Sequence, residues 1–172
     1  MTGKTFTDAP SQMDKAQFMA VFGGIYEHSP WVAERSWEKG VTAEHDRIEA
    51  LAATMAEVLA EATRAEQLDL INAHPDLAGK AAMAGKLTQA STGEQASAGL
   101  DQCSAEEFEK FTRLNEAYKE KFGFPFIMAV KGRHRSEILD AFETRLEHDE
   151  AVEFQTALDQ INRIALLRLN DL

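Results

Sequence analysis

The chain has 172 residues, of which 44% are hydrophobic and 27% are charged. These values are typical of one globular domain with a single core, and they exclude a chain that is disordered throughout. Asp and Glu outnumber Lys and Arg by 29 to 18, and the net charge of −11 disfavours nucleic acid and anionic membranes as partners.

The cysteine content and the N-terminus indicate a cytoplasmic protein. Cys103 is the single cysteine, which excludes an internal disulfide framework and a cysteine-rich zinc site. No apolar run approaches the roughly 20 residues that span a bilayer. Residues 1–12 are polar and lack the apolar stretch of a signal peptide, so we expect a flexible N-terminal segment there.

The residue composition predicts an all-α fold. The chain contains only 4 prolines and 10 glycines, alternating strand-like patterns are nearly absent, and strong helix formers dominate. We therefore expect residues 1–172 to form a single-domain bundle of roughly eight helices.

The first half of the chain contains four predicted helices. A Ser-x-x-Asp pattern at Ser11 is typical of a helix start, and Ser29-Pro30 is typical of an N-cap followed by the first helical residue. Thr42 begins a long segment whose apolar residues recur every three or four positions. The predicted helices cover residues 11–22, 29–37, 42–62 and 64–73.

The second half begins with a segment of small and polar residues. Residues 74–99 contain few large apolar side chains, so we expect them to lie on the surface, where loops often carry function. Ser104 opens a strongly predicted helix, and the run 126–130 is apolar enough for a core. Two final helices are predicted at residues 136–146 and 150–169.

His74 is the first candidate for chemistry. It precedes Pro75, which disfavours the α conformation at His74 and predicts a helix end near Ala73. A histidine held in a restricted, non-helical conformation can act as an acid or a base near neutral pH. The alternative is that His74 only caps the carbonyl groups at the end of the preceding helix.

The sequence Ser91-Thr-Gly-Glu94-Gln95 has a structural and a functional interpretation. Ser91 and Glu94 fit a capping box, and a helix start alone would then explain both residues. In the functional interpretation the same geometry places Glu94 in a first helical turn, where free N–H groups favour an ionised carboxylate. Such a carboxylate can orient an imidazole and fix its tautomer.

Two further segments could line a site. Phe126 and Ile127 follow a Gly-Phe-Pro turn, so backbone N–H groups there could face a ligand, although the segment also suits a core. Arg168 lies in a mostly apolar helical turn. It is suited to binding a planar carboxylate, and the alternative is an arginine that extends its charge to solvent.

A metal site has no support in the sequence. None of the five histidines belongs to a Glu-x-x-His or His-Glu-x-x-His motif. The sequence Glu27-His28-Ser-Pro-Trp31 contains catalytic residue types, but we interpret it as a capped helix start with Trp31 in the core.

The order of these segments resembles that in the OHCU decarboxylases, where OHCU is 2-oxo-4-hydroxy-4-carboxy-5-ureidoimidazoline, a late intermediate of urate breakdown. The resemblance spans roughly residues 18–172. The motifs that carry it are, in chain order, Glu27-His-Ser-Pro-Trp31, His74-Pro-Asp-Leu-Ala-Gly-Lys80, Ser91-Thr-Gly-Glu-Gln95 with Gly99-Leu100, Leu114-Asn-x-x-Tyr118, Lys121-Phe-Gly-Phe-Pro-Phe126 and Ala165-Leu-Leu-Arg-Leu169.

The resemblance implies an all-α homodimer that decarboxylates OHCU to (S)-allantoin without a cofactor. It places the catalytic histidine at His74 and its acidic partner at Glu94. The implied partner is the small anionic ureidoimidazoline substrate. The substrate-contacting positions that the resemblance implies are Pro75, Ser91, Gln95, Phe126, Ile127 and Arg168.

Two other classes of function stay open at this point. One is a non-enzymatic helical interaction domain, in which His74 and Glu94 are only helix caps. The other is a hydrolase of a ureido or hydantoin compound, in which His74 activates water. Product analysis separates the hydrolase from a decarboxylase, because only decarboxylation releases CO₂ and leaves the ureido group intact.

Overall fold

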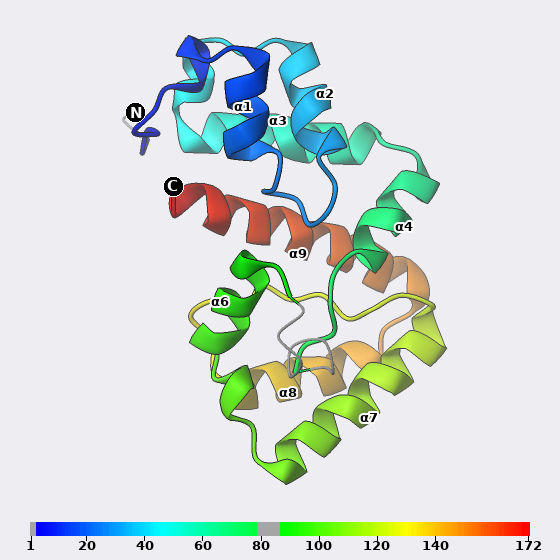
Figure 1. Cartoon of the computed structure of the whole chain (residues 1–172). Coiled ribbons are helices and arrows are strands. Elements are labelled where there is room, and N and C mark those ends of the chain that lie inside the picture. The colour runs from blue at the N-terminus through cyan, green and yellow to red at the C-terminus, as the bar shows by residue number, and fades with distance from the viewer. Residues whose placement is uncertain (1–2, 79–86) are drawn as a thin grey trace. The chain divides into compact units, whose positions relative to one another are not determined.

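The computed structural model describes residues 3–78 and 87–172, which form helices joined by loops (Figure 1). These residues contain eight α-helices and three short 3-10 helices. They contain no β-strand, and only an isolated bridge joins Thr5 to Arg47. The predicted all-α fold with roughly eight helices is therefore confirmed.

The chain divides into two compact units. Unit 1 contains Met1–Ala73 and Ile161–Leu172, and unit 2 contains His74–Gln160. The last helix, α9 (Glu150–Asn170), contributes residues to both units. The organisation of residues 1–172 as one domain stays a prediction.

Unit 1 is built mainly from four helices that follow the predicted intervals closely. Helix α1 contacts α2, and α2 contacts α3. No helix within the two described stretches of the chain is long and apolar enough to cross a membrane. The four helices are α1 (Lys15–Phe22), α2 (Trp31–Lys39), α3 (Ile48–Glu61) and α4 (Arg64–Asn72).

The start of α1 differs from the prediction. Asp14, and not Ser11, caps this helix, because Asp14 and Gln17 form a reciprocal capping box. The Ser11 hydroxyl instead donates to Asp46 Oδ2 at 2.7 Å. The predicted start at Ser11 is therefore wrong, and the glutamine at the third helical position completes the capping box of Asp14 instead.

The predicted N-cap of α2 is also wrong. The Ser29 hydroxyl donates to the carbonyl oxygen of Glu27, and α2 begins after Pro30 without a side-chain cap. Trp31, predicted in the core, is only half-buried, and the Arg35 guanidinium lies 4.7 Å from its ring centroid.

The core of unit 1 forms where the sequence predicts it, with one interruption. Thr42 caps a short 3-10 helix (Ala43–Asp46), and α3 begins only at Ile48. Phe18 and Phe22 of α1 are buried. The buried side chains of α3 recur every three or four residues, and they are Ile48, Leu51, Met55, Val58 and Leu59.

Residues 3–12 contact the rest of unit 1. Phe6 is buried, and its ring centroid lies 5.2 Å from that of Phe22. The Phe6 N–H donates to the carbonyl oxygen of Asp46 at 2.9 Å. The flexibility of residues 1–12 stays a prediction.

Unit 2 contains α6 (Gln89–Ser97), α7 (Ala105–Phe122), α8 (Arg135–Leu146) and the first part of α9. Ser104 caps α7 as predicted, in a capping box with Glu107. Helix α7 ends at Gly123, whose φ of 79° lies in the left-handed region that favours glycine. Helices α7 and α8 lie against each other (Figure 1).

Aromatic side chains fill the core of unit 2. The Tyr118 ring is fully buried, and the centroids of four phenylalanine rings lie between 4.5 and 6.0 Å from its own. Phe126 stacks on Phe142 with centroids 3.8 Å apart. The predicted core run at residues 126–130 is buried at four of its five positions.

Candidate functional site

His74 follows the end of α4, as the His74-Pro75 pair predicts. Helix α4 has Ala73 as its C-cap, and both His74 and Pro75 are half-buried. Ala78 is buried and has a φ of 51°, a left-handed conformation that is rare for a residue with a Cβ atom. Backbone strain of this kind persists only where surrounding contacts hold it.

Gln95 of α6 holds this segment by both ends of its buried carboxamide. Its Oε1 accepts from the N–H of Ala78 at 3.0 Å, and its Nε2 donates to the carbonyl oxygen of Asp76 at 3.3 Å. The side chain therefore fixes the 74–78 segment against α6. Gly79 and Lys80, which complete the predicted motif, lie outside the described residues.

Helix α7 holds the same segment from a second direction. Asn115 Nδ2 donates to the carbonyl oxygen of Leu77 at 3.0 Å, and Lys119 Nζ lies 2.7 Å from Asp76 Oδ2. Asn115 is 3% exposed, and its Oδ1 has no hydrogen-bond partner among the residues that the structure describes. The backbone after His74 is thus fixed by side chains from two helices.

Helix α6 begins earlier than the predicted capping box. Thr88 is its N-cap and accepts from the N–H of Ser91 at 3.2 Å, so the predicted cap at Ser91 is wrong. Glu94 consequently lies in the second turn, and the free N–H groups of a first turn do not surround it. The spacing places Ser91, Glu94 and Gln95 on one face of α6, where Ser91 and Gln95 are buried and Glu94 is half-buried.

Phe126 and Ile127 are both buried and both contact Arg145 of α8. Arg145 Nη1 donates to the carbonyl oxygen of Ile127 at 2.6 Å, and the guanidinium carbon lies 4.2 Å from the Phe126 ring centroid. Ala129 lies two residues after Ile127, and its N–H donates to Gln160 Oε1 at 2.9 Å. This non-helical segment is therefore held by side chains at a carbonyl and at an N–H group.

Arg168 lies in unit 1 and is buried, so the alternative of a solvent-directed arginine is wrong. Its Nη2 lies 2.8 Å from Glu27 Oε2, and its Nη1 donates to the carbonyl oxygen of Ile25 at 3.1 Å. Glu27 is 2% exposed, and His28 Nε2 lies 3.9 Å from its other carboxylate oxygen. The interpretation of residues 27–31 as only a capped helix start is therefore wrong as well.

Hydrogen bonds of Gln95 bring the predicted residues together in part. Gln95 joins the helix that carries Ser91 and Glu94 to the segment that follows His74. Arg168 belongs to the other unit, and its sharing of one site with the rest stays a prediction. The predicted residues of unit 2 are His74, Pro75, Ser91, Glu94, Gln95, Phe126 and Ile127.

Two buried charged side chains that hold these segments, Arg145 and Glu153, were not predicted from the sequence, and Asn115 was named there only as part of a motif. A sequence signal for the two charged residues existed. Arg145 follows Phe142 by three positions and Glu153 precedes Ala157 by four, so each continues the apolar face of its helix. A charged residue at such a position is buried only with partners, which makes it informative.

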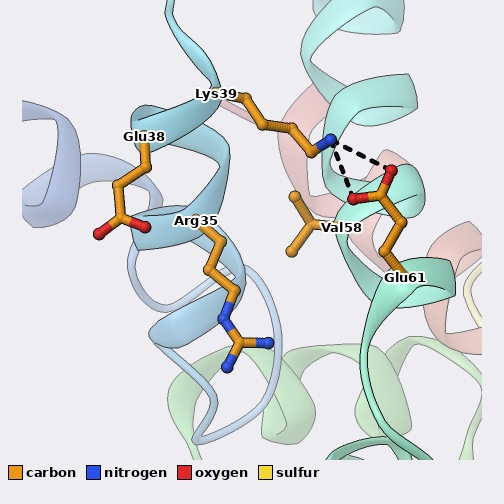
Figure 2. Close-up of a pocket in the computed structure, with 5 residues that line it drawn as sticks. All are labelled: Arg35, Glu38, Lys39, Val58 and Glu61. Carbon is orange, nitrogen blue, oxygen red and sulfur yellow. Dashed lines mark hydrogen bonds and ion pairs between the residues drawn. The ribbon is translucent and has the colours of Figure 1, made fainter.

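Unit 1 also has an open surface pocket of about 360 Å³ between α2 and α3. Figure 2 shows Lys39 reaching across the pocket to Glu61, with the Nζ–Oε2 distance at 3.0 Å and Val58 between the two helices. The second basic residue of the pocket, Arg35, pairs with Glu66. Since both cations have acidic partners, the pocket offers little net positive charge to an anionic ligand.

The described part of the chain contains no group of three or more His, Cys, Asp or Glu side chains arranged to hold a metal ion. Cys103 is half-buried and unbridged, and burial raises the pKa of its thiol. The titratable residues that the sequence predicts for the site are His74, Glu94 and Arg168.

Comparison with known proteins gives one consistent family. Residues 11–170 match the OHCU decarboxylase family. The 2-oxo-4-hydroxy-4-carboxy-5-ureidoimidazoline decarboxylase of Haloferax volcanii is 46% identical over 159 residues, which cover 92% of this chain and 90% of the relative. The protein of the same name from Halalkalicoccus jeotgali is 44% identical over 172 residues. The match covers 100% of this chain and 93% of the relative.

A crystal structure of (S)-allantoin synthase has the same fold, with a TM-score of 0.73 and 32% sequence identity. The match covers 92% of this chain and 50% of that one. The fold and these matches define the class of the protein as a carboxy-lyase, an enzyme that removes CO₂ from its substrate. Within this class, the chain belongs to the OHCU decarboxylase family, as the order of its motifs predicts.

Proposed function

We propose that this chain catalyses the decarboxylation of OHCU to (S)-allantoin in urate degradation. The observation that carries the proposal is the family match over residues 11–170, which includes every predicted site residue. The two-ended contact of Gln95 supports it, because this contact holds the backbone at Asp76 and Ala78, directly after His74-Pro75, on the helix that carries Glu94.

The reaction breaks the bond between a ring carbon and the carboxylate. CO₂ leaves, and the electron pair of the broken bond is delocalised through the adjacent C=N group, whose nitrogen takes up a proton, so that the hydroxyl-bearing and ureido-bearing carbons form an enol. Delivery of a proton to one face of the ureido-bearing carbon, as the hydroxyl group becomes a carbonyl group, gives the single enantiomer. The protein has to hold the ring, stabilise the developing oxyanion and supply that proton, and no cofactor is needed for these tasks.

In this mechanism His74 does the acid–base work and Glu94 orients its imidazole. Ser91 and Gln95 hydrogen-bond the ureido or hydroxyl groups, and the backbone at Phe126 and Ile127 supports a carbonyl. Arg168 holds a group that stays in the product, because tight binding of the leaving carboxylate would stabilise the ground state and not the transition state. Pro75 contributes to the wall beside His74.

The first test is turnover by His74→Ala and Glu94→Ala. We expect kcat to fall by roughly 10²–10⁴-fold, the usual contribution of general acid–base catalysis. OHCU is generated freshly from urate by urate oxidase and hydroxyisourate hydrolase, and (S)-allantoin is followed by circular dichroism.

His134→Ala is the matched control. His134 caps α8 in the same unit, so its loss lowers stability and leaves kcat unchanged. Near-normal kcat in His74→Ala or Glu94→Ala would overturn the proposed role of that residue. A product with a cleaved ureido group would favour the hydrolase, and turnover that a chelator abolishes would contradict the absence of a metal.

We also propose that the protein is a homodimer in the cytoplasm. The family resemblance supports the dimer. The single, unbridged Cys103 supports a reducing compartment, since the fold does not depend on a disulfide within the chain.

A further inference from the structure

A buried charged network in unit 2 contacts the Phe126–Ile127 segment. Its centre is Glu153, which is 0% exposed and has three hydrogen-bond partners. Tyr118 Oη donates to Glu153 Oε1 at 2.6 Å, Arg145 Nε donates to the same oxygen at 2.8 Å, and His148 Nδ1 lies 2.9 Å from Oε2. These contacts link α7, α8 and α9.

Arg145 extends this network to the proposed wall of the substrate site. The same guanidinium that pairs with Glu153 donates from Nη1 to the carbonyl oxygen of Ile127 and lies against the Phe126 ring. Because the guanidinium is planar and rigid, these contacts fix the position of a carbonyl group and of an aromatic ring together. Lys121 also donates to a carbonyl oxygen, that of Leu146, and lies 5.0 Å from the Phe122 ring centroid, but Lys121 is exposed whereas Arg145 is buried.

Stability alone does not account for this arrangement. The desolvation of a buried ion pair often exceeds its Coulombic gain, and apolar residues of similar volume frequently serve as well. Arg145 Nη2 is moreover buried without a hydrogen-bond partner in the described chain, which adds an unfavourable contribution. An apolar residue could not donate the hydrogen bond that fixes the position of the Ile127 carbonyl group.

We propose that Arg145 is a positioning residue of the decarboxylase. Held by Glu153, it sets the position of the Phe126 ring and the Ile127 backbone against the bound ring, and with it the face of the substrate carbon that receives the proton. This inference rests on the proposed function and on substrate contact by Phe126 and Ile127.

The deciding variant is Arg145→Lys. A lysine keeps the charge and can reach Glu153, but it cannot also donate to Ile127 and cover Phe126. We expect kcat to fall by about 10- to 100-fold with KM changed much less, because a small misplacement affects the transition state most. We also expect the excess of (S)-allantoin to fall, since a misplaced enol is protonated on both faces of its ureido-bearing carbon.

Two further variants complete the experiment. Arg133→Lys is the matched control, because Arg133 is an exposed arginine of the same unit whose contact with Glu137 is a 3.9 Å surface pair. It should retain the wild-type kcat and product chirality. Glu153→Gln keeps the acceptor oxygen and loosens Arg145, so it should shift kcat and chirality in the same direction as Arg145→Lys, by less.

Each outcome decides the inference. The inference is overturned if the Arg145→Lys and Glu153→Gln proteins fold and keep the wild-type kcat and product chirality. It is also overturned if the loss of activity in each variant equals the loss of folded protein. Failure of both variants to fold at the assay temperature would show a structural role and contradict it equally. If the wild-type protein produces no allantoin above the uncatalysed rate, the proposed decarboxylase function itself is wrong. This result distinguishes failure of the proposed function from failure of the inference about Arg145.

Discussion

Glu27 and Arg168 form an ion pair in unit 1 that is almost fully removed from water, with exposed fractions of 2% and 8%. Their closest atoms are 2.8 Å apart, and the carbonyl oxygen of Ile25 accepts a further hydrogen bond from the guanidinium. Each charge depends on the other, because a buried charge that loses its partner is strongly destabilising. Glu27 therefore sets where the Arg168 guanidinium lies.

We predict that Glu27→Gln lowers the free energy of unfolding by about 3 kcal/mol, because it removes the buried carboxylate that pairs with the Arg168 charge. Glu61→Gln is the matched control. It breaks the partly exposed pair with Lys39 and should change the unfolding free energy by less than about 1 kcal/mol. Urea denaturation measures both values, and equal effects would contradict the assignment of the buried pair.

At the scale of single residues, the sequence predicted the candidate site residues but not the side chains that hold them in place. His74 was predictable because a following proline restricts its conformation whatever the fold. The local sequence around Glu27 indicates only a helix start, since its partner Arg168 is 141 positions away. A partner at such a separation leaves no trace in local sequence patterns.

Helix α6 carries Ser91, Glu94 and Gln95, and its start depends on Thr88. We predict that Thr88→Ala lowers the unfolding free energy by about 1 kcal/mol, because the N–H of Ser91 loses its side-chain acceptor. Thr92→Ala removes an exposed threonine of the same helix, whose hydroxyl only donates back to the Thr88 carbonyl, and it should be nearly neutral. Thermal unfolding of the two variants checks this, and a larger loss in Thr92→Ala would refute the position of the cap.

Helix α4 has an acid-sensitive start. The Arg35 guanidinium, together with the Thr63 backbone, lowers the pKa of Glu66 to about 2 from its usual 4.5. Because the folded-state pKa lies below the unfolded one, the unfolded chain binds more protons in this interval, and stability rises with pH across it. The contribution of Glu66 is thus complete above about pH 4.5 and is lost as the pH falls toward 2.

We predict that Glu66→Gln flattens the pH dependence of stability in this window. Urea midpoints measured between pH 2 and pH 5 should fall less steeply on acidification in the variant than in the wild type. A variant with an unchanged slope would show that the pairing of Glu66 with Arg35 does not contribute to the acid response.

At the scale of elements, the sequence predicted which segments are helical and misplaced several of their starts. Helix interiors were predictable because apolar spacing is set by the face that the helix buries. The caps of α1, α2 and α6 were not, because neighbouring residues offered competing hydrogen-bond patterns. Small differences in local geometry decide between such patterns, and these depend on packing.

The proposed homodimer belongs to the scale of the whole molecule. Each chain has a mass of 19.1 kDa, and we expect light scattering after size exclusion to give twice this value. Because a net charge of −11 makes two copies repel each other, the dimer should dissociate less at moderate salt than at low salt. A monomeric mass at all protein and salt concentrations would refute the dimer.

The sequence by itself determined the helical class, the family and the identity of the candidate acid–base pair, because composition, apolar periodicity and short motifs are properties of the local chain. Only the tertiary structure decided which side chains hold the site. Gln95 and Asn115 fix the backbone after His74, and Arg145 fixes Ile127, through bonds between residues 17 to 38 positions apart. Such bonds exist only once the helices have packed, since burial both excludes water and brings these polar groups within reach of each other.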